Sequence, residues 1–167
     1  MLKPILITLV IIFLVVVQIS LLPSLGWFIP LLLNLPLLFV ACSALWLDFG
    51  LAVFIACLAG LFLDYYSPFF FGFFGLVFLL SVLLIKFFHL NFFQHRNLGS
   101  FLIANLLSLL VFRAIGLVTY FFFLSQVLSV THWIFFLGQL VVHGLLTIVI
   151  YFFLGPLIGR QKNLALA

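Results

Sequence analysis

The stretch GLAVFIACLAGLFLDYYSPFFFG, Gly50 to Gly72, combines an apolar run, one of the only two acidic residues of the chain, and a turn. Its small residues Ala52, Ala56 and Gly60 recur every four positions, so they lie on one face of a helix. Small side chains let two helix backbones approach closely in lipid. The stretch therefore predicts a tightly packed helix that crosses a membrane and carries Asp64 at its end.

The whole chain shares this apolar character. Of its 167 residues, 69% are hydrophobic and 5% are charged, and the mean hydropathy is +1.60. A soluble domain has about a quarter of its residues charged, which is what solvates its surface. The composition predicts an integral protein of a lipid bilayer. The net charge of +4 gives no sign of nucleic-acid binding, because the chain contains no basic run.

Clusters of Pro, Gly, Asn and charged residues divide the chain into six apolar segments, and a transmembrane helix needs about 20 such residues. We expect an all-α polytopic membrane protein, a single domain over residues 1–167. The first segment is expected to be a retained span, because no small-residue cleavage site follows it. The six predicted transmembrane helices are residues 5–22, 28–47, 49–64, 72–90, 100–124 and 133–157.

The start of the second span is the least defined boundary. Pro30, Asn34 and Pro36 lie in its first half. Proline inside a helix removes a hydrogen bond and breaks or kinks the helix. Part of Trp27 to Leu35 is therefore either helical, interfacial or re-entrant.

The basic residues predict the orientation of the chain. An even number of spans puts both termini on one side of the membrane. Lys3, Lys86, Arg96, Arg160 and Lys162 all fall on that side, whereas the opposite connections contain no Lys or Arg. By the positive-inside rule, both termini are expected to be cytoplasmic.

Several polar residues fall within the predicted spans, where ionisable groups are costly. Arg113 lies about 20 Å into the fifth span. We hypothesise that it pairs with Asp64; the alternative is that Arg113 snorkels to lipid headgroups. His143 is expected to hydrogen-bond a neighbouring helix. The same interhelical role is expected of Asn34, Asn105, Gln139, Ser43, Ser81 and Ser108.

No set of residues in the sequence predicts catalysis. Asp48 and Asp64 lie at opposite ends of one span, so they cannot act as a carboxylate pair. The four histidines show no metal-ligand spacing, and Cys42 and Cys57 are interpreted as packing residues within helices. The motifs of hydrolases, zinc proteases and nucleotide-binding proteins are missing from the sequence. We predict a protein that is not an enzyme and uses no cofactor or metal.

Residues Gly60, Asp64, Ser67 and Gly72 form a Gly-x-x-x-Asp pattern, followed by Ser three residues after the Asp and Gly eight residues after it. This pattern resembles the central signature of the bacterial rod shape-determining protein MreD family. Pro36 matches a proline that this family has near the start of its second span.

The chain also departs from the family pattern. Pro68 stands where family members usually have a glycine, and Phe69, Phe70 and Phe71 are unusually bulky. Arg113 matches no family position.

The resemblance implies a six-helix fold similar to the substrate-binding subunits of energy-coupling-factor vitamin transporters. It further implies a non-catalytic scaffold of the cell-wall elongation complex in the bacterial inner membrane. The implied partners are MreC and, with it, a RodA-type glycosyltransferase, a class B penicillin-binding protein and the MreB filament. The candidate structural and partner-binding residues are Pro36, Ala52, Ala56, Gly60, Asp64, Ser67, Gly72 and Arg113.

Three points stay open at the level of the sequence. The small-residue face at Ala52, Ala56 and Gly60 fits either ordinary helix packing or the docking of a partner's helix. Asp64 is expected to anchor either the turn through Tyr65 to Ser67 or a helix pair. A vitamin-binding transporter subunit is the alternative function, but the β-branched first span has no small-residue face for a coupling subunit. A small enzyme or channel has the least support.

Overall fold

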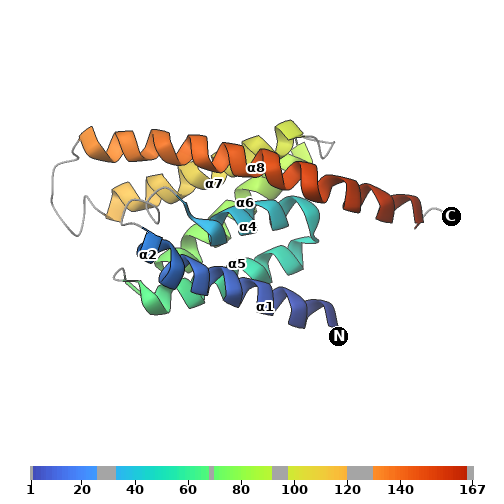
Figure 1. Cartoon of the computed structure of the whole chain (residues 1–167), viewed down its shortest axis with the longest axis horizontal. Coiled ribbons are helices and arrows are strands. Elements are labelled where there is room, and N and C mark those ends of the chain that lie inside the picture. Colours follow the sequence, from blue (N-terminus) through green and yellow to red (C-terminus); the bar gives the residue numbers. More distant parts are fainter. Residues whose placement is uncertain (1, 26–32, 68–69, 92–97, 120–129, 165–167) are drawn as a thin grey trace.

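The computed structural model describes residues 2–25, 33–67, 70–91, 98–119 and 130–164. All secondary structure in these ranges is helical, as predicted (Figure 1). The first helical segment comprises α1 (Leu2–Val16), the π-helical turn η1 (Val17–Leu21) and α2 (Leu22–Leu25). It is followed by α4 (Leu35–Trp46), α5 (Phe49–Tyr66), α6 (Phe73–Asn91), α7 (Leu98–Thr119) and α8 (Val130–Leu164).

Among the described residues, five helical segments are long and apolar enough to cross a membrane. Their outward-facing side chains are largely leucine, isoleucine, valine and phenylalanine, which suit contact with lipid tails. The chain is therefore a multi-pass membrane protein. The five segments are Ile7–Ser24, Phe49–Tyr66, Phe73–Asn91, Leu98–Thr119 and Trp133–Phe153.

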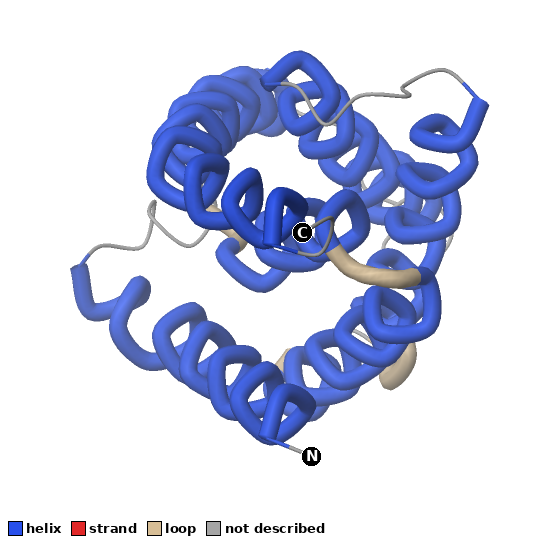
Figure 2. The backbone as a smooth tube through the Cα atoms, turned by 90° about the vertical axis from the view of Figure 1, so that its right-hand side faces the viewer, coloured by secondary structure: helices blue, strands red, loops and turns tan. Residues whose placement is uncertain are grey.

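Successive helices run back and forth along the long axis of the molecule (Figure 1). The start of α1 and the end of α8 lie at the same end, and both face the viewer when the molecule is seen along its axis (Figure 2). We call this end the terminal end. The opposite end, where α5 leads into α6, is called the Asp64 end.

The helix expected at residues 28–47 differs most from its prediction. The part of it that the structure describes is only 12 residues long, α4, or about 18 Å. Residues 28–32 lie outside the described ranges, and Leu33 and Asn34 are not helical. The helix begins at Leu35 because the Asn34 side chain caps it, accepting a hydrogen bond from the Leu37 N–H at 3.1 Å, and because Pro36 suits the first turn.

The other boundaries agree more closely with the predicted spans. Helices α5 and α6 match their spans to within two residues at each end. The first helix was expected to stop at Leu22, but it continues through η1 and Pro23 to Leu25. Helix α7 starts two residues early, and residues 120–124 lie outside the described ranges. Helix α8 starts three residues early and continues seven residues beyond the predicted end.

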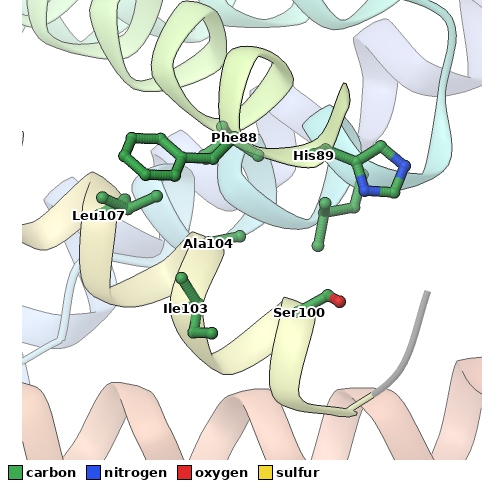
Figure 3. A pocket seen from close by; sticks show the side chains of 8 residues that line it. Phe88, His89, Ser100, Ile103, Ala104 and Leu107 are labelled. Carbon is green, nitrogen blue, oxygen red and sulfur yellow. The ribbon is translucent and has the colours of Figure 1, made fainter. Parts of the chain in front are cut away.

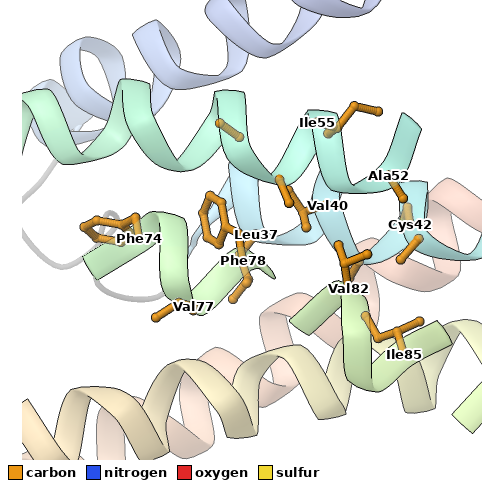
Figure 4. Close-up of a cluster of buried hydrophobic side chains, with 14 of the residues drawn as sticks. Leu37, Val40, Cys42, Ala52, Ile55, Phe74, Val77, Phe78, Val82 and Ile85 are labelled. Atoms are coloured by element: carbon orange, nitrogen blue, oxygen red, sulfur yellow. The ribbon is translucent and has the colours of Figure 1, made fainter. Parts of the chain in front are cut away.

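The core lies between α4, α5 and α6, with α7 packed against α4 and α6 (Figure 4). Phe73 and Phe74 of α6 pack against Phe112 of α7, with ring centroids 6.4 and 6.1 Å apart. Helices α1 and α8 are peripheral, because 17% of each of their spans is buried, against 39% in α5 and α6. Most of the surface of α1 and α8 therefore faces lipid. The fully buried side chains include Leu37, Val40, Ala52, Ile55, Val77 and Phe78.

Candidate functional site

The signature residues meet where α5 packs against the start of α6. A Cβ atom added to Gly60 would lie 2.4 Å from the Cα of Gly75 and 2.6 Å from its nitrogen, far inside van der Waals contact. The two backbones therefore touch at Gly60. Ala52 and Ala56, on the same face of α5, are also fully buried. The interpretation of this face as a surface open to a partner's helix is wrong, because the chain itself covers it.

Asp64 ties the end of α5 to the beginning of α6. One of its carboxylate oxygens accepts a hydrogen bond from the Phe74 N–H at 2.7 Å, and the other accepts one from the Gly75 N–H at 3.1 Å. The first N–H groups of a helix have no partner within the helix, and the helix dipole favours an anion beside them. Only 4% of Asp64 is exposed. The carboxylate is therefore the anchor of a helix pair, one of its two expected roles.

The turn between the two helices uses the other signature residues. Ser67 ends α5, and its N–H donates to the Asp64 carbonyl at 3.3 Å. Gly72 immediately precedes α6 with a φ of +99°, a conformation that L-residues other than glycine rarely adopt. Gly60, Asp64, Ser67 and Gly72 thus build one corner of the molecule, which we call the α5–α6 corner. Pro36 lies apart from it, buried in the first turn of α4.

A second group of polar residues surrounds the start of α4. The Asn34 N–H donates to Nε2 of His143 on α8 at 3.0 Å. The Leu35 N–H donates to the side-chain oxygen of Gln18 at 3.0 Å, and the Gln18 amide donates to the Leu33 carbonyl at 2.9 Å. A helix that begins inside an apolar bundle has unpaired N–H groups. Here, side chains from the two peripheral helical segments pair them.

His143 extends this network to α7. Its Nδ1 lies 3.4 Å from Oδ1 of Asn105, whose amide donates to the Thr147 hydroxyl at 2.9 Å. That hydroxyl donates in turn to the His143 carbonyl at 2.7 Å. Because Nε2 accepts from the Asn34 N–H, we assign the ring proton to Nδ1, from which it is donated to Asn105. The network thus joins α4, α7 and α8.

The predicted role of His143 in interhelical hydrogen bonding is thus confirmed, as are those of Asn105 and Gln139. The three serines behave differently. The hydroxyls of Ser43, Ser81 and Ser108 each donate to a carbonyl three or four residues earlier in their own helix. A buried serine can be satisfied within its own helix in this way, so it needs no neighbour.

The hypothesised pair of Asp64 and Arg113 is wrong. Both oxygens of Asp64 are engaged by α6. Arg113 on α7 instead faces α8, where its Nη2 donates to the Gln139 side-chain oxygen at 3.0 Å and its guanidinium carbon lies 5.5 Å from the centroid of the Phe136 ring. The distance of each residue from the ends of its helix indicated similar depths, but it did not indicate which neighbouring helix each would face.

A small hollow lies toward the terminal end between α4, α6 and α7, with Phe88 and His89 on one side and Ser100 and Ala104 on the other (Figure 3). Its volume is about 10 Å³, no larger than the space that a single water molecule needs. Among the described residues there is no group of three or more His, Cys, Asp or Glu side chains that could hold a metal ion. Cys42 and Cys57 are free thiols.

No protein-family model, curated protein or solved structure matches this chain at a significant level. The structure by itself therefore supports an all-helical, multi-pass membrane protein with a tightly built α5–α6 corner.

Proposed function

We propose that this chain is a non-catalytic scaffold of the bacterial cell-wall elongation complex, of the MreD type. One observation carries the proposal: the four residues that resemble the MreD signature all serve the same α5–α6 corner. Gly60 gives the close contact, Asp64 caps α6, Ser67 ends α5 and Gly72 supplies the positive φ. Because all four matching residues contribute to one structural feature, the match supports the resemblance more strongly than four unrelated identities would.

The proposed setting is the bacterial inner membrane, with the terminal end in the cytoplasm. The proposed direct partner is an MreC-like single-pass protein, and the RodA-type glycosyltransferase, the class B penicillin-binding protein and MreB assemble with it. The small-residue face is occupied within the chain, so the partner must use the outer surfaces of the bundle. The hollow between α4, α6 and α7, with its volume of about 10 Å³, is itself too small for a vitamin, which fills a pocket of about 300 Å³ or more.

The test is depletion of this chain in the bacterium that carries it. Rod-shaped cells should become round, and the unaltered chain should restore the rods. The Gly116→Ala chain should do so too, because a methyl group there meets no atom within 4 Å. An affinity-tagged chain should also retain an MreC-like protein through purification. Cells that stay rod-shaped during depletion, or a chain that purifies alone with a bound small molecule, would overturn the proposal.

A further inference from the structure

Arg113 has a positive charge that the chain does not neutralise. The sequence contains only two side-chain acids, Asp48 and Asp64. Asp64 is engaged by the first N–H groups of α6. Asp48 precedes α5, 16 residues and about 24 Å away from Asp64 along that helix. The printed sequence therefore has no further carboxylate side chain to offer Arg113, in the described ranges or outside them.

The contacts that Arg113 makes inside the chain are neutral. Gln139 provides one amide oxygen, and Phe136 provides the face of an aromatic ring. The guanidinium has five N–H donors, and its Nε is buried without a hydrogen-bond partner among the described residues. The buried Nε is not available to an external group, but the guanidinium as a whole is only half-buried, and its described contacts leave its positive charge without a counter-ion.

The depth of the side chain narrows the choice of acceptor. Helix α7 is about 33 Å long, close to the roughly 30 Å of a bilayer's hydrocarbon core. Arg113 lies about 7 Å beyond its middle, toward the Asp64 end, and so about 8 Å below the edge of that core. The bond to Gln139, nine residues into α8, holds the guanidinium beside that helix. A lipid phosphate lies outside the core, whereas a carboxylate on another transmembrane helix can lie at the same depth.

The surface around Arg113 suits a helix. Leu110 and Leu117, one turn before and one turn after Arg113 on α7, are 46% and 38% exposed. Ala114 is exposed as well, and its small side chain permits a close approach. A half-buried cation thus lies beside an exposed apolar surface of α7, at a depth that a carboxylate on another transmembrane helix can reach.

We propose that the α7–α8 surface around Arg113 is a docking site for a transmembrane helix of a partner protein, and that an Asp or Glu in this helix forms an ion pair with Arg113. The inference does not depend on the cell-wall role, because it requires only a partner with an acid in its span. A second copy of this chain does not meet this requirement, because Asp64 is buried in the α5–α6 corner and Asp48 lies toward the terminal end, away from Arg113.

The test uses photo-cross-linking in the native membrane. A benzoylphenylalanine at position 114 should capture a membrane protein whose span contains an acid. The same group at position 83, where Leu83 is an exposed residue of α6, should not capture it. Arg113→Gln should lower the yield of this adduct at least about tenfold, since loss of one partner of a buried charge pair is strongly unfavourable. Arg113→Lys keeps the charge and should keep more of the adduct than Arg113→Gln.

A charge exchange then identifies the pair. Arg113→Glu should abolish the adduct, and replacing the partner's acid with Arg should restore it. If the Arg113→Gln chain fails to fold, judged by size-exclusion chromatography, the unaltered chain is used with the partner's acid changed to its amide, and the adduct must again fall at least about tenfold. The proposal is overturned by an adduct that ignores these changes, by adducts only with lipid or with a second copy, or by no adduct.

Discussion

Gly60→Ala gives the sharpest prediction about the α5–α6 corner. The new methyl carbon would lie 2.4 Å from the Cα of Gly75, where ordinary contacts are 3.4–4 Å. Backbone atoms cannot rotate out of the way, so α5 and α6 must separate by about 1 Å at this point. The same separation would stretch the bonds of Asp64 to the Phe74 and Gly75 N–H groups, now 2.7 and 3.1 Å, to about 3.7 and 4.1 Å.

Two effects of this separation lower the free energy of unfolding. Overpacking in a close-packed interior costs about 1–3 kcal/mol. Hydrogen bonds to a charged group contribute about 1.5–3 kcal/mol each, and here two weaken together. Because these terms are not additive, we expect a loss of about 3 kcal/mol in the free energy of unfolding, or about 150-fold in the folding equilibrium.

The assay is reversible unfolding by SDS in mixed micelles, followed by tryptophan fluorescence. Gly116→Ala in α7 is the matched control, because the added methyl group meets no atom within 4 Å and alanine is the better helix former. This control should unfold at the same SDS fraction as the unaltered chain or at a slightly higher one. If Gly60→Ala behaves like Gly116→Ala, the close contact of α5 and α6 does not exist in the membrane, and the reasoning about the corner fails.

Substitutions of Asp64, Gly72 and His143 test the remaining contacts by the same assay. Asp64→Ala removes the acceptor of two buried N–H groups and should cost about 2–4 kcal/mol, whereas Asp64→Asn keeps one acceptor and should cost about half as much; equal stability of the two variants would contradict the cap. Gly72→Ala places a side chain at a φ of +99° and should cost about 1–2 kcal/mol. An unchanged midpoint would mean that the turn has another conformation. His143→Phe leaves the Asn34 N–H without its acceptor and should cost about 1–3 kcal/mol, while Leu145→Phe, on the lipid-facing side of α8, should be neutral. Similar losses in both would mean that ring size, and not the hydrogen bond, accounts for the effect.

The α5–α6 corner shows which features could be predicted from residues that lie close together in the sequence. The four-residue spacing of Ala52, Ala56 and Gly60 defines a helix face in any helical chain, so the tight packing of α5 was predictable. The helix that packs on that face was not predictable. Gly75 and Phe74 belong to α6, whose angle and depth depend on the whole bundle. For the same reason, the sequence indicated that Asp64 anchors a helix pair or a turn, but it did not identify the N–H groups that Asp64 binds.

The polar cluster at the start of α4 was partly visible in the sequence. Asn34 and Pro36 are typical of a helix start, and they raised the possibility of a re-entrant segment. Gln18 and His143, which complete the pairing of that helix start, are 16 and 109 residues away from Asn34. Helical periodicity relates only residues that lie close together in the sequence, so it does not predict contacts between residues this far apart. The expected role of His143 could therefore be stated only as a hydrogen bond to some neighbouring helix.

The sequence alone determined the solvent of this protein and the glycines that make its corner possible, because hydropathy and the lack of a Cβ in glycine act locally. Only the tertiary structure decided which charges and amides meet. Asp64 is engaged by α6 and Arg113 faces α8, since each partner is set by the register of whole helices. That register leaves Arg113 without an acid of its own, which is why a partner's carboxylate is the ion pair we propose.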